Sequence, residues 1–183
     1  MKFMLLFAGS ALLASAGLIV NGSFDAGHCS TGSSCHIAAG STALTGWQTG
    51  GQGVDWYRTG VVDLNGTLSQ SIATSVGQSY LLTFDIASSG VECRLPNAQQ
   101  LSVDLNGIHQ TFSVSSTSWN SQHLLFTANA PSTTVTFASA NYKGPMLDNV
   151  SVIQTSATPE PGTGMLLAGG LGAALFYLVK RSH

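Results

Sequence analysis

Hydrophobic and polar side chains alternate with a period of two in several short runs of this chain. The run Leu68-Ser69-Gln70-Ser71-Ile72 is a clear example. Such alternation is typical of a half-buried β-strand, because successive side chains of a strand point to opposite faces. Between residues 17 and 158 no run shows a sustained helical period. The pattern predicts strands at 18–20, 68–72, 80–86, 101–105, 108–114, 124–127, 133–138 and 147–153.

Turn residues separate these runs. Asn106-Gly107 lies between two alternating runs and predicts a type I′ hairpin, because both central residues of that turn need positive φ. Further turns are expected at Asn65-Gly66, at Gly77-Gln78 and around Pro131. Roughly eight to ten short strands at this spacing predict an all-β fold, a β-sandwich or jelly roll.

The N-terminus has the pattern of a signal peptide. Lys2 supplies a positive charge, residues 3–13 are apolar, and Ala14-Ser15-Ala16 reads as a small-x-small cleavage site. A second membrane helix is the alternative, but the run is short and ends in small residues. We expect a signal peptide over 1–16, cleaved after Ala16, and a β-sandwich domain over 17–155.

The C-terminus combines three features in order. Pro159-Glu160-Pro161 closes a linker over 156–161, an apolar run follows over 162–179, and Lys180 and Arg181 come just before the end. As a helix, 18 apolar residues span roughly 27 Å, close to the hydrocarbon thickness of a bilayer. We therefore expect a transmembrane helix with a basic tail over 162–183, and the basic residues stay cytoplasmic by the positive-inside rule.

This order resembles the PEP-CTERM sorting signal of Gram-negative bacteria, which exosortase-type membrane proteases recognise. The resemblance implies an exported protein that passes through the inner membrane and ends in the cell envelope, at the cell surface or in the extracellular matrix. The implied partners are such a sorting protease and, before processing, the membrane itself. A plain C-terminal anchor is the alternative.

Charge excludes one class of partner. Residues 17–158 carry seven acidic and three basic side chains, a net charge of −4 with His neutral. Nothing in this composition offers a basic face, so we expect no nucleic-acid partner. Ser, Thr, Gly, Asn and Gln supply most of the polarity instead, as is common in exported β-proteins.

A second resemblance covers nearly the whole body. It rests on Leu18 to Asp25, Gly46-Trp47, Gly53 to Tyr57, Val62 to Gly66, Ser69 to Ile72, Gly77 to Tyr80, Leu82 to Asp85 and Gly144 to Val152. In order and spacing these segments resemble the choice-of-anchor C family of exported bacterial domains, and they are also similar to a related plant cell-wall family. The resemblance implies a galactose-binding-like jelly roll, the architecture of many carbohydrate-binding modules. Two departures are Asp25, where Glu is more common, and the extra segment 28–36.

The resemblance also implies a structural calcium site. Asp25 and Asp148 lie near the two ends of the domain, which pair as neighbouring strands in such jelly rolls. Ca²⁺ takes six to eight oxygen ligands, partly backbone carbonyls, and the turn over 21–25 would supply some of them. Alternatively, Asp25 forms a turn and Asp148 accepts local hydrogen bonds at the start of a strand.

Cys29 and Cys35 lie close together, flanked by His28 and His36. In an exported protein, nearby cysteines favour a disulfide. Five residues separate them, whereas structural zinc sites usually have two to four, so a zinc site is the weaker alternative. Free thiols, or a pairing with Cys93, also remain open.

Candidate ligand residues are aromatic. Trp47, Trp56, Tyr57 and Trp119 could each stack on a sugar or pack in the core. Trp56 and Tyr57 are adjacent, so on a strand one of them faces outward. Asp55 and Arg58 flank the pair, and the stretch Asp55-Trp56-Tyr57-Arg58 is therefore the predicted ligand surface.

Catalytic signals are weak. The chain contains no Gly-x-Ser-x-Gly, His-Glu-x-x-His or phosphate-binding loop. Asp63, Asp85 and Asp104 could supply the two carboxylates of a glycosidase, but strand and turn roles explain each of them. We expect a non-catalytic envelope or matrix protein that binds exopolysaccharide. The competing hypotheses are a structural matrix protein without a ligand site and a weak glycan hydrolase.

Overall fold

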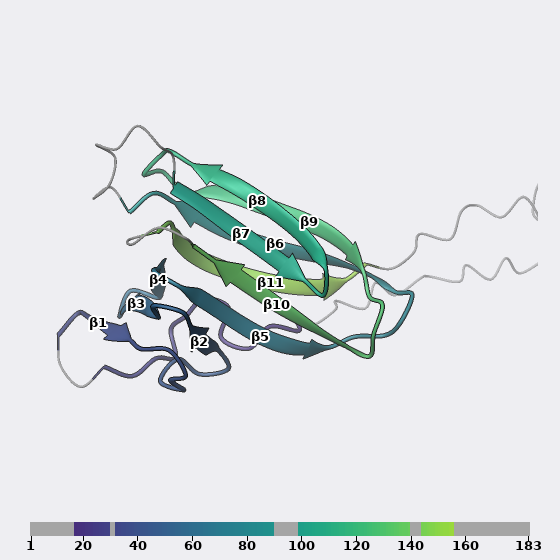
Figure 1. The fold of residues 1–183 in the computed structure, drawn as a ribbon, viewed down its shortest axis with the longest axis horizontal. Coiled ribbons are helices and arrows are strands. Elements are labelled where there is room, and N and C mark those ends of the chain that lie inside the picture. The colour runs from purple at the N-terminus through teal and green to yellow at the C-terminus, as the bar shows by residue number, and fades with distance from the viewer. Residues whose placement is uncertain (1–16, 30–31, 90–98, 140–143, 156–183) are drawn as a thin grey trace, which may run out of the picture.

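A computed structural model describes residues 17–29, 32–89, 99–139 and 144–155 (Figure 1). In it, the alternating runs of the sequence form the long strands. The described residues form β1 Ser34–Ile37, β2 Gln48–Gly50, β3 Val54–Tyr57, β4 Val61–Leu64, β5 Thr67–Ala73, β6 Ser79–Ala87, β7 Gln99–Leu105, β8 Ile108–Val114, β9 Asn120–Thr127, β10 Ser132–Ala138 and β11 Met146–Gln154.

These strands make two antiparallel sheets that pack face to face as a jelly-roll β-sandwich, which confirms the predicted fold class. One sheet has six strands in the order β1-β3-β4-β11-β6-β9, and the other has five in the order β2-β5-β10-β7-β8. No helix in the described ranges is long and apolar enough to cross a membrane. The predicted signal peptide 1–16, linker 156–161 and membrane segment 162–183 lie outside the described residues.

Strong alternation located the strands well. The strand predicted over 108–114 is β8 with the same bounds, and the others differ from β5, β6, β7, β9, β10 and β11 only at their ends. The predicted turn is also present, with positive φ at both Asn106 (50°) and Gly107 (98°). Local sequence therefore determines this hairpin.

The strand predicted over 18–20 is wrong. This segment instead lies beside β11 through single hydrogen bonds, from Leu18 N to Val152 O (2.8 Å) and from Val150 N to Gly22 O (2.9 Å). A Cβ on Gly22 would lie 1.8 Å from the Val150 oxygen, so only glycine allows this approach. β11 pairs with β4 only through Met146 and Leu147, and the N-terminal segment lies beside the following residues, Val150 and Val152.

The predicted strands did not include β1, β2, β3 and β4. β1 and β2 have four and three residues, too few to show a period. All four residues of β4 are buried, so its apolar positions do not alternate with exposed ones. A strand that is buried on both faces shows no alternation of polar and apolar residues, so a period of two cannot reveal it.

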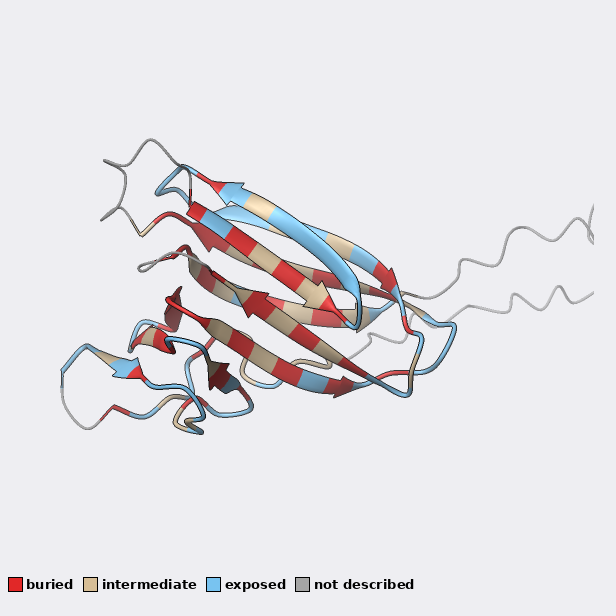
Figure 2. Ribbon diagram, in the orientation of Figure 1, coloured by how far each residue is buried: buried red, intermediate tan, exposed pale blue. Residues whose placement is uncertain are grey.

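Buried positions recur along the strands of both sheets (Figure 2), and aromatic rings join the two sheets through the core. Trp47 lies 5.3 Å from Phe24 and 6.2 Å from Phe137, between ring centroids. Phe84 of β6 then meets Phe137 of β10 edge to face at 5.2 Å, and Phe112 of β8 at 5.3 Å. Such tilted and edge-on pairs are favourable geometries for buried rings. Because these rings pack between the two sheets, they hold the sheets in a fixed position relative to each other.

Candidate functional site

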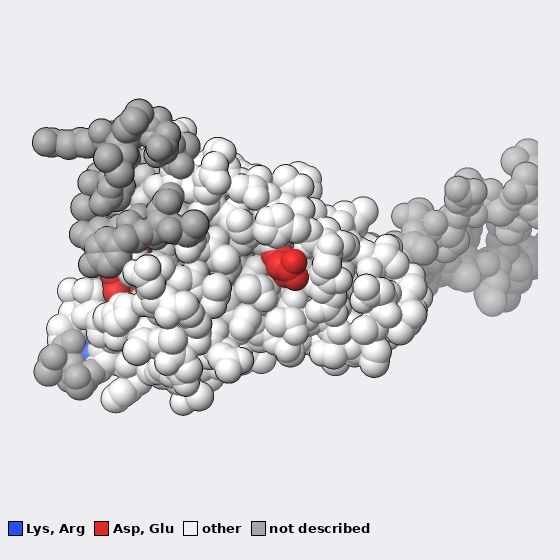
Figure 3. Space-filling model, in the orientation of Figure 1, with Lys and Arg blue, Asp and Glu red and all other residues white. Residues whose placement is uncertain are grey.

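The two sheets differ sharply in charge. The strands of the six-stranded sheet carry Asp55, Asp63, Asp85 and Asp148, whereas those of the five-stranded sheet carry only Asp104. No strand of either sheet carries Lys or Arg. Figure 3 shows a face of the sandwich with few charged side chains, an acidic patch near its middle and further charged atoms at its left end. The two outer faces therefore suit different ligands.

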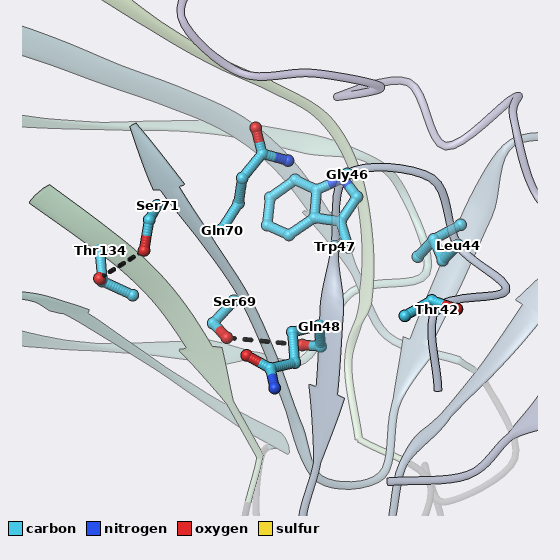
Figure 4. Close-up of a pocket in the computed structure, with 9 residues that line it drawn as sticks. All are labelled: Thr42, Leu44, Gly46, Trp47, Gln48, Ser69, Gln70, Ser71 and Thr134. Carbon is cyan, nitrogen blue, oxygen red and sulfur yellow. Dashed lines mark hydrogen bonds between the residues drawn. The ribbon is translucent and has the colours of Figure 1, made fainter. Parts of the chain in front are cut away.

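A groove with a volume of about 490 Å³ opens where the outer face of the five-stranded sheet meets the loop before β2 (Figure 4). It is lined by Thr42, Leu44, Gly46, Trp47, Gln48, Ser69, Gln70, Ser71 and Thr134. Alternation in β5 places Ser69 and Ser71 on the outer face, and Thr134 of β10 is paired with Ser71 in the sheet. The sheet itself thus brings three hydroxyl groups into one groove.

Hydrogen bonds fix these hydroxyl groups. Ser71 Oγ and Thr134 Oγ1 lie 2.9 Å apart, and Ser69 Oγ donates to the Gln48 carbonyl oxygen at 3.5 Å. In the described part of the chain, the side-chain amide of Gln48 has no hydrogen bond, and this residue is exposed. An amide and neighbouring hydroxyls offer both donors and acceptors, as a polyhydroxylated ligand requires.

The wall of the groove is held from behind. Gln70 points into the sandwich, where its Oε1 accepts from Val20 N (2.7 Å) and its Nε2 donates to Val20 O (2.9 Å). Trp47 is only 3% exposed, and its Nε1 donates to the Asn21 carbonyl oxygen at 3.0 Å. The N-terminal segment therefore fixes the groove, which is largely preformed.

In the predicted ligand surface, one of the two aromatic rings is buried and the other lies on the opposite face of β3. Trp56 is 3% exposed, and its Nε1 donates to the Phe24 carbonyl oxygen at 2.7 Å, so this ring belongs to the core. Tyr57 lies on the opposite face of β3 and is half-buried. Burial first, and then the charges of Asp63 and Asp55, raise the pKa of the Tyr57 hydroxyl above its ordinary value.

The remaining two residues of that stretch have structural contacts. Asp55 receives a contact from His36 Nδ1 at 2.9 Å on one oxygen and a hydrogen bond from Asn65 Nδ2 at 3.0 Å on the other. Arg58 donates from Nε to the Gly32 carbonyl oxygen (2.6 Å) and from a terminal nitrogen to that of Cys29 (2.9 Å). Asp55 thus links β3 to β1 and to Asn65 after β4, and Arg58 links it to the carbonyl oxygens of Cys29 and Gly32.

The disulfide between Cys29 and Cys35 is present, with Cα atoms 5.9 Å apart, as predicted. The disulfide joins the start of β1 to Cys29 before it, and Arg58 donates to the carbonyl oxygens of Cys29 and Gly32 on the same side. Cys93 lies outside the described residues. The bridge therefore orders a polar segment at the edge of the six-stranded sheet.

Asp148 lies on the outer face of the six-stranded sheet, opposite Asp85 of β6. Burial raises the pKa of its carboxyl above the ordinary value, and the charges of Asp85 and Asp25 raise it further, against a lowering by the hydrogen bond from Asn149 N. Asn149 sits at positive φ (52°) in the bulge of β11 and donates to Asp85 at 2.8 Å. Asp25 is therefore near enough for its charge to act on the Asp148 carboxyl.

The surroundings of Asp25 offer oxygen ligands. Ser23 Oγ donates to Asp25 at 2.7 Å. Asp25 Oδ1 and the Ser23 carbonyl oxygen would lie 2.7 and 2.6 Å from a Cβ on Gly60, so both oxygens converge on the space that glycine leaves open. Hard oxygen donors of this kind fit Ca²⁺ chemically. No three His, Cys, Asp or Glu side chains of the described ranges gather closely enough to form a metal-binding cluster by themselves.

The fold and groove define an all-β jelly-roll protein with an uncharged polar groove on one sheet. Residues 17–153 match the family model described as "Protein of unknown function (DUF642)", and the chain belongs to this family. No curated protein sequence matches the chain significantly.

Several solved structures are similar in fold. One, described as "CBM4 structure and function", is 16% identical with a TM-score of 0.49 and covers 75% of this chain and 99% of its own. A family 35 carbohydrate-binding module from Clostridium thermocellum is 14% identical, with a TM-score of 0.40 and coverage of 67% and 89%. The C-terminal CBM6 of a laminarinase from Zobellia galactanivorans is 14% identical, with a TM-score of 0.39 and the same coverages. Similarities this weak say nothing about what this chain binds.

Sequence reasoning missed the groove. Thr42, Gln48, Ser71 and Thr134 come from separate parts of the chain, and each looks like an ordinary solvent-facing residue. One signal was available. The outward positions of β5 and β10 are filled with Ser, Thr and Ala and contain no charged residue, which is unusual for an exposed sheet face.

Proposed function

We propose that this protein is an exported, non-catalytic protein of the cell envelope or extracellular matrix that binds neutral polysaccharide. The binding site is the groove on the outer face of the five-stranded sheet. The observation that carries this proposal is the lining of the groove, where hydroxyl and amide groups are held in a fixed arrangement without any charged side chain.

A neutral ligand fits this lining best. Ser69, Ser71 and Thr134 offer hydroxyl groups, and Gln48 adds an amide that both donates and accepts. Sugar hydroxyls have the same dual capacity, so they can replace the water that covers these groups without leaving donors or acceptors unpaired. An acidic ligand would find no cation on the strands of this sheet.

The same lining favours binding over hydrolysis. Glycosidases need two carboxylates about 5–10 Å apart across a cleft. The described residues that line the groove include no carboxylate, imidazole or thiol, and therefore no general acid or base. A matrix protein without a ligand site remains the competing hypothesis, and the binding experiment below decides between the two.

Export and sorting depend on segments outside the described residues. The family assignment covers residues 17–153 and so includes neither end. Cleavage after Ala16, and recognition of Pro159-Glu160-Pro161 with the apolar run by an exosortase-type protease, are supported by their sequence pattern. Mass spectrometry of the exported protein tests both, with an expected start at Gly17 and loss of the apolar run. An intact C-terminus in envelope fractions would leave a plain membrane anchor.

Calcium is proposed as a structural ion between Asp25 and Asp148. The donors would be their carboxylates and the Ser23 carbonyl oxygen. When bound, the ion neutralises negative charge that otherwise accumulates on this face. It also holds the N-terminal segment against β11, the same segment that fixes the groove through Val20 and Asn21.

Binding can be tested with exopolysaccharide from the producing cells, separated by anion exchange into neutral and acidic fractions. We expect the full-length protein, in mild detergent, to bind the neutral fraction. Gln48→Ala should weaken binding about tenfold, as loss of one or two hydrogen bonds implies. Gln100→Ala is the matched control, since Gln100 is exposed on the same sheet but outside the groove. Equal binding by both variants would contradict the proposed site.

A further inference from the structure

β8 forms one edge of the five-stranded sheet. Among the described strands it pairs only with β7, through a continuous register from Gln99–Val114 to Leu105–Ile108 without a bulge. Five of its seven residues are exposed, and Figure 2 shows it as a mostly exposed ribbon. Within the described ranges it is therefore a long, regular edge with one unpaired side.

The turn determines which backbone groups of β8 point away from β7. In a two-residue hairpin the flanking residues, here Leu105 and Ile108, form a hydrogen-bonded pair. Because such pairs alternate along an antiparallel ladder, Gln110 and Phe112 also bond to β7. The N–H and C=O groups of His109, Thr111 and Ser113 consequently point away from β7. The Thr111 carbonyl oxygen accepts a long hydrogen bond from its neighbour Gln110 Nε2 (3.4 Å), which pairing with another strand would replace.

This edge lacks the features that usually prevent pairing between molecules. Natural edge strands are commonly blunted by charged side chains, proline, bulges or short length. β8 has seven residues (Ile-His-Gln-Thr-Phe-Ser-Val) and contains no Lys, Arg, Asp, Glu, Pro or Gly. By contrast, β1 and β2 at the opposite edges have only four and three residues.

The sequence of β8 is complementary to itself about Thr111. Antiparallel pairing of two copies around this residue places Thr111 opposite Thr111, His109 opposite Ser113, and Ile108 opposite Val114. Thr–Thr and β-branched apolar pairs are favourable cross-strand neighbours. Residues that face the core in one copy also meet core-facing residues in the other, so the register keeps both faces matched.

We propose that two copies of this chain associate through β8, as a two-fold symmetric dimer in which the five-stranded sheets join into one continuous sheet. Each of the three outward-facing residues pairs through both of its backbone groups, with Thr111 on the two-fold axis. The half-exposed Ile108, at 38%, is covered by Val114 of the second copy.

The dimer also has a consequence for the groove. The outer face of the sheet runs on from one copy to the other, so that two grooves lie on the same side of a single sheet. A polysaccharide long enough to reach both would bind with increased avidity. This consequence rests on the proposed function, whereas the pairing itself does not.

Disulfide cross-linking tests the pairing in the full-length protein in mild detergent. Residues opposite each other in a hydrogen-bonded pair have Cα atoms about 5.5 Å apart, within the range of a disulfide. With Cys93 replaced by Ser, Thr111→Cys should form a covalent dimer at least about tenfold faster than Leu125→Cys, because the thiols are already neighbours. Leu125 is the matched control, since it is 62% exposed on β9, the long edge strand of the other sheet.

A backbone variant provides the second test. Thr111→Pro removes an N–H that points to the unpaired side and breaks no bond to β7, so the far-ultraviolet circular dichroism should not change. Sedimentation equilibrium should then show a monomer, whereas Thr111→Val, which keeps the N–H, should stay dimeric. A dimer that persists in Thr111→Pro, or cross-linking as fast through Leu125→Cys, would overturn the proposal. Neither test involves a glycan, so a failure here leaves the proposed function standing.

Discussion

The hydroxyl groups of Ser71 on β5 and Thr134 on β10 lie 2.9 Å apart on the outer face of the five-stranded sheet. The pairing of the two strands sets this contact, since the residues are direct partners in the sheet. One hydroxyl orients the other, and together they fix the polar floor of the groove.

Removing one hydroxyl should affect binding more than stability. Thr134→Val keeps the shape of the side chain, and Ser71 is exposed, so water can replace the lost partner. We expect the free energy of unfolding to change by less than about 1 kcal/mol, and binding of neutral exopolysaccharide to weaken about fivefold. Denaturant titration and a binding isotherm measure the two effects. A large loss of stability with unchanged binding would assign the pair to the fold alone.

Trp56 should behave as a core residue. Trp56→Phe leaves the buried carbonyl oxygen of Phe24 without its 2.7 Å hydrogen bond, which should cost about 1–3 kcal/mol of stability. Trp119→Phe is the control, because Trp119 is 46% exposed. Thermal unfolding of both variants checks the prediction. If Trp56→Phe instead lost glycan binding at full stability, the ring would belong to a ligand site.

The disulfide should contribute modestly. Cys29 and Cys35 close a short loop, so the chain-entropy model gives less than the ~3 kcal/mol expected for a 15-residue loop. The double variant to Ser should remain folded, with lower stability. Thiol labelling without reductant should mark Cys93 alone. Labelling of all three cysteines in the native protein would exclude the bridge in solution.

Asp148 should make the stability depend on pH. Burial and its acidic neighbours raise its pKa in the folded state, so the charged form is penalised above that pKa. The penalty is relieved as pH falls through the folded pKa toward the unfolded value of about 3.9. Without calcium, Asp148→Asn should therefore melt higher than wild type at pH 7, and the difference should vanish near pH 4. A constant difference across this range would exclude the titration of Asp148 as its cause.

Bound calcium should raise the stability of the folded protein, because it offsets the charge of the ionised Asp148 carboxyl. At a hundredfold excess over the dissociation constant, a bound ion stabilises the folded state by about 2.7 kcal/mol, which corresponds to several degrees. Wild type should gain this stability and Asp148→Asn should not. Asp104→Asn, on the other sheet, should respond as wild type does. Melting curves of the wild type that do not respond to calcium or chelator would refute the ion site.

Prediction from sequence succeeded where structure is local. The hairpin at Asn106-Gly107 and the strand of residues 108–114 follow from turn chemistry and a period of two. Alternation also placed Trp56 and Tyr57 on opposite faces, but it did not tell which of the two rings is buried. Trp56 is the buried ring, and its Nε1 donates to the Phe24 carbonyl oxygen. That partner is 32 residues away in the chain.

The groove was beyond sequence reasoning for the same reason. Gln48, Ser69 and Thr134 meet only through the pairing of β2, β5 and β10, and that order is a property of the whole sheet. Asp25 and Asp148 were placed together by a family resemblance rather than by local pattern. In the structure the charge of Asp25 is among those that raise the pKa of the Asp148 carboxyl.

The central claim is that an uncharged groove on the five-stranded sheet binds a neutral polysaccharide, and the dependence of binding on salt tests it most directly. Between about 0.01 and 1 M ionic strength the Debye length falls from about 30 to 3 Å, which removes long-range electrostatic attraction. We predict that the full-length protein binds the neutral exopolysaccharide fraction with an affinity that stays constant across this range. The Gln48→Ala variant should bind the same fraction more weakly. Binding that disappears with salt, or no binding to this fraction at any ionic strength, would contradict the account.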